Sequence, residues 1–90
     1  MTAEEFDKKY SSYLEEGHYG LGISHPEVVA YLDKEFEKEI EKNPEFKFSQ
    51  IKMKFGYSRV YTTSDKNSEW ETEIDRIFRK QSDGKKISNH

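Results

Sequence analysis

Apolar residues near the N-terminus recur at helical spacing. They fall at i, i+4, i+7 and i+8 and so share one face of a helix, at Phe6, Tyr10, Tyr13 and Leu14. Thr2 and Glu5 have the spacing of a capping box, in which two side chains satisfy backbone N–H groups reciprocally. Gly17 suits the left-handed conformation that commonly follows a helix. The pattern therefore predicts a first helix between the Thr2 cap and Gly17.

A second apolar stripe indicates a helix over residues 25–42. Its members repeat every three to four residues and leave a charged opposite face, at Val28, Val29, Leu32, Phe36 and Ile40. Ser24 and Glu27 fit a second capping box. Asn43 and Pro44 should end this helix, since proline disfavours helical geometry in the residue before it.

A third helix is predicted from an apolar face formed by Trp70, Ile74, Ile77 and Phe78. Ser68 and Glu71 fit a third capping box. Residues 82–90 show no periodicity, so we expect a mobile C-terminal tail after a single domain that spans residues 1–81.

Between the last two helices the hydrophobic period changes to two. In KFSQIKMKFGYSRVYTT, residues 47–63, apolar and basic side chains alternate on both sides of a glycine, which is typical of a β-hairpin. Gly56 and Tyr57 fit a two-residue type II′ turn, which needs glycine first. This turn pairs Met53 with Val60. A change of parity among the apolar residues predicts a register break at residues 49–50.

One further segment is ambiguous. In residues 19–23, Tyr19, Leu21 and Ile23 alternate with two glycines, which fits either a short edge strand or a structured loop. The pattern as a whole predicts an α+β fold, in which three amphipathic helices pack on a small antiparallel β-hairpin. The element order is α-α-β-β-α, with the short strand as an optional addition.

Charge is distributed unevenly along the 90 residues, which carry a net charge of −3. Residues 1–46 sum to −7, residues 47–64 to +4 and residues 65–90 to zero. Segregation of this kind bears on binding partners rather than on the fold. The chain has no cysteine, which excludes disulfides and thiolate chemistry and fits a reducing compartment.

The hairpin prediction sends the cationic side chains to the face turned away from the helices. Such a face can follow phosphates and stack a base. We expect it to bind nucleic acid or a partner through Lys47, Lys52, Lys54, Tyr57, Arg59 and Tyr61. The alternative is that these charges only keep the hairpin soluble and block edge pairing.

The second helix offers an alternative protein-binding face. Asp33, Glu37 and Glu41 form an i, i+4, i+8 row, which can dock on a basic groove or mediate a homodimer. The same row is also compatible with an ordinary solvent-exposed face.

Candidate catalytic chemistry is sparse. His18 and His25 flank the glycine-containing segment, and either is a candidate acid or base for a small ribonuclease. The sequence contains no metal-binding histidine pair at helical spacing, no Walker loop and no dinucleotide fingerprint. We therefore expect a protein that is not an enzyme, with no catalytic residues, no cofactor and no metal site.

The block SHPEVVAYLDKEFEKEIEKNPEFKFSQIKMKFGYSRVYT, followed by a short helix with a tryptophan, resembles small proteins of phages and prophages. This class includes host-defence antagonists such as anti-CRISPR proteins. The resemblance implies a non-enzymatic inhibitor that binds a larger nucleic-acid-processing complex, or the RNA that the complex carries. Because no signal peptide or membrane-spanning run is visible, we expect a cytoplasmic protein, in the host cytosol if it is phage-encoded, with no membrane partner.

Overall fold

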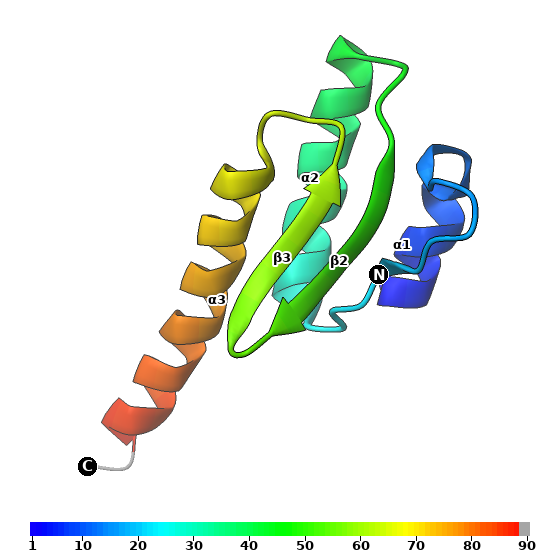
Figure 1. Cartoon of the computed structure of the whole chain (residues 1–90). Helices are drawn as coiled ribbons and strands as arrows, with labels where there is room; N and C mark the ends of the chain where they lie inside the picture. Colours follow the sequence, from blue (N-terminus) through cyan, green and yellow to red (C-terminus); the bar gives the residue numbers. More distant parts are fainter. Residues whose placement is uncertain (89–90) are drawn as a thin grey trace.

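The chain is described by a computed structural model that covers the backbone of residues 1–88 and the side chains of residues 1–80. Within this part the elements are α1 (Ala3–Lys9), β1 (Gly20–Leu21), α2 (Pro26–Lys42), β2 (Phe48–Lys54), β3 (Tyr57–Thr62) and α3 (Asn67–Ser88). The strands form one mixed sheet in the order β1-β2-β3. The predicted α+β class and the antiparallel hairpin are confirmed, and the optional strand within residues 19–23 does form, which gives the order α-β-α-β-β-α (Figure 1).

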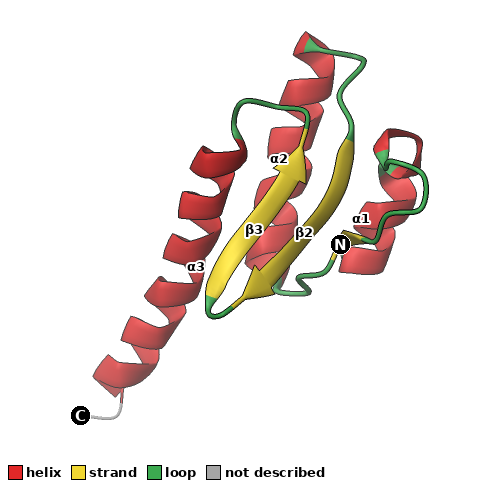
Figure 2. Cartoon of the chain, in the orientation of Figure 1, coloured by secondary structure: helices red, strands yellow, loops and turns green. Residues whose placement is uncertain are grey.

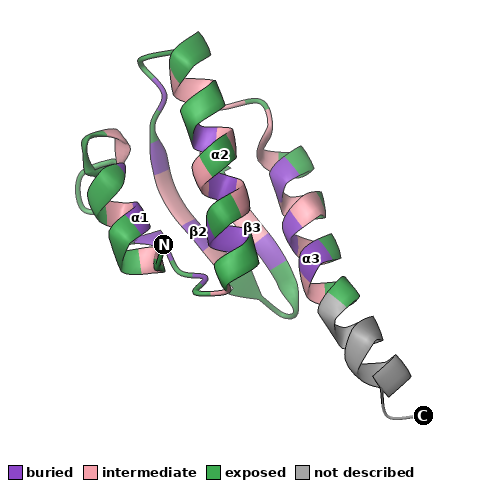
Figure 3. Ribbon diagram, turned by 180° about the vertical axis from the view of Figure 1, so that it is seen from behind, coloured by how far each residue is buried: buried purple, intermediate pink, exposed green. Residues whose placement is uncertain are grey.

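The helices leave one face of the hairpin open. In Figures 1 and 2, β2 and β3 lie in front of α2, while α1 and α3 flank the strands. Seen from behind, α2 lies over the strands, and buried and exposed positions alternate along it (Figure 3). The core therefore lies between α2 and one face of the sheet, and no helix within residues 1–88 covers the other face of β2 and β3.

The core is built around one aromatic ring. The centroid of the fully buried Phe36 ring on α2 lies 4.9–5.4 Å from those of five other aromatic rings, which belong to Phe6, Tyr10, Phe46, Phe48 and Trp70. Tilted and edge-on aromatic pairs of this kind contribute about 0.5–1.5 kcal/mol each beyond their buried area. The cluster joins α1, α2, β2 and α3 into one core.

The first helix is shorter than predicted. Its capping box between Thr2 and Glu5 is present, but α1 ends at Lys9 and a 3-10 turn over Ser11–Tyr13 follows. The chain then turns so that Leu14 can pair with Phe48 of β2 in an isolated parallel bridge. Gly17 adopts a left-handed φ of 81°, as expected, but in the loop beyond this bridge rather than at the helix end.

The two other predicted capping boxes are wrong. α2 is capped by His25, whose Nδ1 accepts from the Glu27 N–H, and not by Ser24. The reason is Pro26, which occupies the first helical position, where its missing N–H is not needed. α3 begins at Asn67, so Ser68 is already helical, and the Glu71 carboxylate accepts a hydrogen bond from β3 instead of from its own helix start.

The short strand β1 runs parallel to β2, pairing Gly20 with Gln50 and Leu21 with Ile51. Gly20 has a φ of 77°, and a Cβ there would lie 2.6 Å from Oδ1 of Asp7 on α1. That oxygen accepts a hydrogen bond of 2.9 Å from the Leu21 N–H. The glycine at position 20 therefore allows α1 to approach the sheet edge closely enough for Asp7 to accept the hydrogen bond from the backbone of β1.

The hairpin turn differs from the predicted one. The turn residues are Phe55 and Gly56, with φ values of 54° and 81°, as in a type I′ turn with two left-handed residues. The register pairs Lys54 with Tyr57 and Ile51 with Val60, which moves the predicted pairing by two residues. Because a shift by two keeps every side chain on its face, the predicted faces are correct. The predicted register break is confirmed between Phe48 and Gln50.

Two predictions concern the C-terminus. The α3 backbone is helical through Ser88, while the side chains of residues 81–90 and the whole of residues 89–90 lie outside the described residues. The domain boundary at residue 81 and the mobile tail at residues 82–90 remain predictions. Among the described helices, none combines the length and the apolar character needed to cross a bilayer.

Candidate nucleic-acid interface

The open face of the hairpin brings together five of the six residues predicted to bind. Alternation along the strands places Lys52 and Lys54 of β2 on the same side as Tyr57, Arg59 and Tyr61 of β3. We call these five residues the basic aromatic face. The opposite side carries Ile51 and Val60, which are buried against the helices.

The cations of the basic aromatic face lie close together on two paired strands. Lys52 is directly opposite Arg59 in the antiparallel register. Within the described residues, no ion pair is formed by Lys52, Lys54 or Arg59. Like charges directly opposite one another in a sheet are destabilising. An anionic ligand on this face would remove that repulsion.

Aromatic rings flank these cations. Tyr57 and Tyr61 are 60% and 47% exposed and lie on either side of Arg59 along β3. Successive side chains on one face of a strand are separated by about 7 Å. The order along β3 is therefore ring, cation, ring, with Lys52 and Lys54 alongside on β2.

Phe55 extends the surface beyond the predicted residues. Its side chain is 86% exposed at the tip of the hairpin, and Nζ of Lys54 lies 5.7 Å from the ring centroid. The turn predicted at Gly56 and Tyr57 leaves Phe55 in a strand. Gly56 is compatible with a turn at residues 55–56 or at residues 56–57. The first requires a positive φ at Phe55, which is rare for a bulky residue, so the sequence favours the second.

The outer edge of β3 is closed by α3. Asp75 Oδ1 accepts from the Ser58 N–H at 2.8 Å, and Glu71 Oε2 accepts from the Val60 N–H at 2.8 Å. One turn earlier, Asn67 Nδ2 donates to the Thr62 carbonyl at 3.1 Å. We call Asn67, Glu71 and Asp75 the edge row. Its i, i+4, i+8 spacing is visible in the sequence, but a polar row at this spacing is also typical of a solvent-exposed helix face.

Lys47, the sixth predicted residue, is directed elsewhere. It lies before β2, and its Nζ donates to the Ser12 carbonyl at 2.9 Å. This contact fastens the loop after α1 to the start of the hairpin. The structure therefore separates Lys47 from the basic aromatic face.

Much of the acidic row on α2 makes internal contacts. Lys9 of α1 donates to Asp33 Oδ1 at 2.8 Å and to Glu37 Oε1 at 2.5 Å, and the Tyr10 hydroxyl donates to Asp33 Oδ1 at 2.5 Å. Partial burial would raise the pKa of Asp33, but these two donors outweigh it and hold that pKa below its usual value. Asp33 and Glu37 thus fasten α1 to α2, whereas Glu41 is exposed and forms no ion pair with the described residues.

The two candidate histidines, His18 and His25, make contacts within the fold. His25 caps α2, and its ring lies 5.0 Å from that of Phe78 in an edge-on contact. His18 Nε2 lies 4.0 Å from Glu15 Oε2 in an exposed loop. Among the described residues, no group of His, Asp or Glu side chains is arranged to hold a metal ion.

Comparison with protein-family models, with curated proteins and with solved structures found no match to this chain.

Proposed function

We propose that this protein is a non-enzymatic interaction module that binds single-stranded RNA through the basic aromatic face. In the setting implied by the resemblance to phage antagonists, it would occupy RNA that a larger nucleic-acid-processing complex carries. The observation that carries the proposal is the opposition of Lys52 and Arg59 on an open sheet face, between two exposed tyrosines and without an acidic partner in the described residues.

The physical argument combines charge and stacking. Cations that contact phosphates release counterions, which gives sequence-independent affinity. Exposed aromatic rings stack unpaired bases, at about 1–3 kcal/mol per base. A duplex hides its base faces, so tyrosines on a sheet favour a single strand. Because the net charge is −3, the protein as a whole does not attract a polyanion at long range. RNA binding would therefore depend on the local cluster of cations and rings on the basic aromatic face.

Fluorescence anisotropy with labelled single-stranded RNA, duplex RNA and duplex DNA, each at two salt concentrations, tests the proposal. We expect the single strand to bind best, with affinity that falls steeply as salt rises. The variant Lys52→Glu/Arg59→Glu should lose binding and keep its circular dichroism spectrum. The matched control Lys8→Glu/Lys34→Glu makes the same change in net charge at two exposed lysines of α1 and α2. Equal affinities of the two double variants would refute the proposed site.

The alternative acidic face is less well supported, because two of its three carboxylates already bind Lys9. Charge reversal at Glu41 distinguishes the two proposals. RNA binding through the basic aromatic face should be unaffected by Glu41→Lys, whereas a partner that docks on α2 should be lost.

A further inference from the structure

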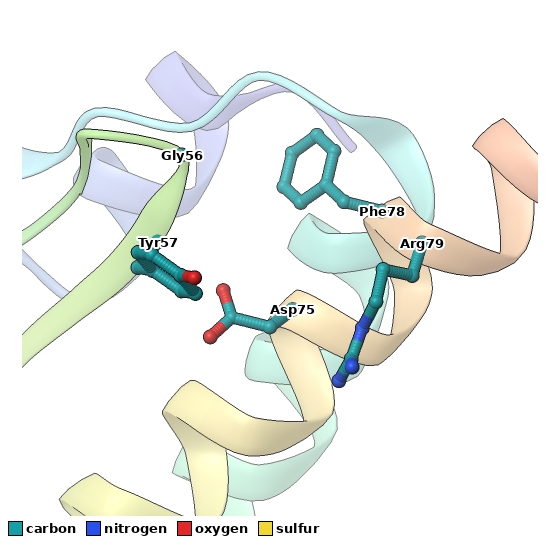
Figure 4. A pocket seen from close by; sticks show the side chains of 5 residues that line it. All are labelled: Gly56, Tyr57, Asp75, Phe78 and Arg79. Atoms are coloured by element: carbon teal, nitrogen blue, oxygen red, sulfur yellow. The ribbon is translucent and has the colours of Figure 1, made fainter.

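A pocket of about 310 Å³ lies where the end of the hairpin meets α3. It is lined by Gly56 and Tyr57 from the hairpin and by Asp75, Phe78 and Arg79 from α3 (Figure 4). This volume is at the lower end of the range for small-molecule sites. Tyr57 also belongs to the basic aromatic face, so the pocket is a continuation of the proposed RNA-binding surface.

The pocket has two aromatic walls and a fixed carboxylate. Figure 4 shows the Asp75 carboxylate pointing toward Tyr57, with the Phe78 ring on the other side of the cavity. Phe78 is held by its edge-on contact with His25 at 5.0 Å. Asp75 is held by the hydrogen bond that Oδ1 accepts from the Ser58 N–H. Its Oδ2 has no hydrogen-bond partner among the described residues.

The chemistry of these groups selects a class of ligand. Aromatic walls suit a planar ring, since every base has a π-face that can stack. A carboxylate only accepts hydrogen bonds, and it pairs well with an exocyclic amino group such as N4 of cytosine. Uracil presents carbonyl oxygens on both sides of its one N–H, and a carboxylate repels them. Arg79, which forms no ion pair with the described residues, can donate to a ring acceptor or to the adjoining phosphate.

We propose that this pocket receives one unpaired base of the bound strand and selects bases with an exocyclic amino group over uracil, through Asp75. This inference rests on the proposed function, since the strand must first lie on the basic aromatic face. It goes further by predicting a base preference on a surface that otherwise contacts phosphates and ring faces without sequence selectivity.

The test compares an eight-nucleotide uridine RNA with a panel in which cytidine replaces uridine at one position at a time. Cytosine and uracil differ at the group that Asp75 would contact. With the unchanged protein, at least one cytidine position should raise the affinity about tenfold or more, the effect of a hydrogen bond to a charged group. The variant Asp75→Asn keeps an acceptor for the Ser58 N–H and should lose this preference while retaining its affinity for the uridine strand.

The outcomes separate the two proposals. If the uridine strand binds and no cytidine position improves on it, the base pocket is refuted and the proposed function stands. If Asp75→Asn retains the cytosine preference, the assignment to Asp75 is wrong. If no single strand binds the unchanged protein, both proposals fail. The control Glu69→Gln removes a carboxylate from an exposed position at the start of α3 and should alter neither affinity nor preference.

Discussion

Replacing Lys52 by glutamate should stabilise the protein and weaken RNA binding in the same molecule. Lys52 lies opposite Arg59, so the substitution converts a like-charged cross-strand pair into an oppositely charged one. Each kind of pair contributes about 0.2–1 kcal/mol, with opposite signs, so the change should add about 0.5–1.5 kcal/mol to the free energy of unfolding. For a domain of this size, 1 kcal/mol corresponds to about 5 °C in Tm.

Thermal unfolding at low and high salt measures this gain. The gain should shrink in 1 M salt, where the screening length is about 3 Å. Lys52→Gln, which removes the repulsion without adding attraction, should give about half of the effect. Lys54→Glu is the matched control, because Lys54 lies opposite the uncharged Tyr57, and no comparable gain is expected from it.

The same variants should lose RNA affinity. Removing one phosphate contact lowers the slope of log affinity against log salt by about 0.7 for a single strand. We therefore expect Lys52→Glu to be more stable and to bind more weakly, which is the behaviour of a residue retained for binding. A Tm below that of the unchanged protein, with RNA affinity unaltered, would show that Lys52 has a structural role and would refute the reasoning.

Three other predictions concern the fold. Gly20→Ala should lower the free energy of unfolding in chemical denaturation by about 2–4 kcal/mol, because it combines left-handed strain with a clash against Asp7. Gly17 has a similar φ with open space around it, so Gly17→Ala should cost only about 1–2 kcal/mol. Equal losses of stability in the two variants would contradict the close approach of α1 to Gly20. Phe55→Asn should add about 0.5–1 kcal/mol to the free energy of unfolding and so raise Tm, since asparagine tolerates the left-handed position at φ 54° better than phenylalanine does. Asp33 has a lowered folded-state pKa, so its contribution is present above the unfolded-state pKa and is lost as pH falls through the folded value. Asp33→Asn should therefore flatten the fall in Tm below about pH 4, and an unchanged pH profile would exclude this linkage.

The helices could be located from the sequence because their apolar stripes agree with their burial. Val28, Val29, Leu32 and Phe36 are fully buried on α2, as the periodicity predicts. Helix ends were harder to place. Three segments fit the same capping box. In α2, however, Pro26 occupies the first helical position and His25 becomes the cap. In α3, the Glu71 carboxylate accepts a hydrogen bond from β3 instead of capping its own helix. Local spacing cannot reveal that a carboxylate is used by a strand distant in sequence.

The basic aromatic face was predictable for a different reason. The turn lies at Phe55 and Gly56 rather than at Gly56 and Tyr57, which moves the register by two residues, and a period of two is unaffected by such a shift. Lys47 was assigned to this face because it is close in sequence, but the structure directs it to Ser12. The pocket beside Asp75 was not predictable, since it joins the hairpin to a helix about 20 residues later and depends on how the two pack.

The way in which α3 closes β3 also limits how the protein can bind. An exposed edge strand invites a partner to add a strand through backbone hydrogen bonds. Here the edge row satisfies the backbone of β3 at three successive outward positions, so strand addition would require α3 to detach together with the buried Trp70 and Ile74. Recognition at this end of the sheet is therefore left to side chains on the open face. Because these side chains are cations and aromatic rings, the surface suits a strand of phosphates and bases better than it suits another β-strand.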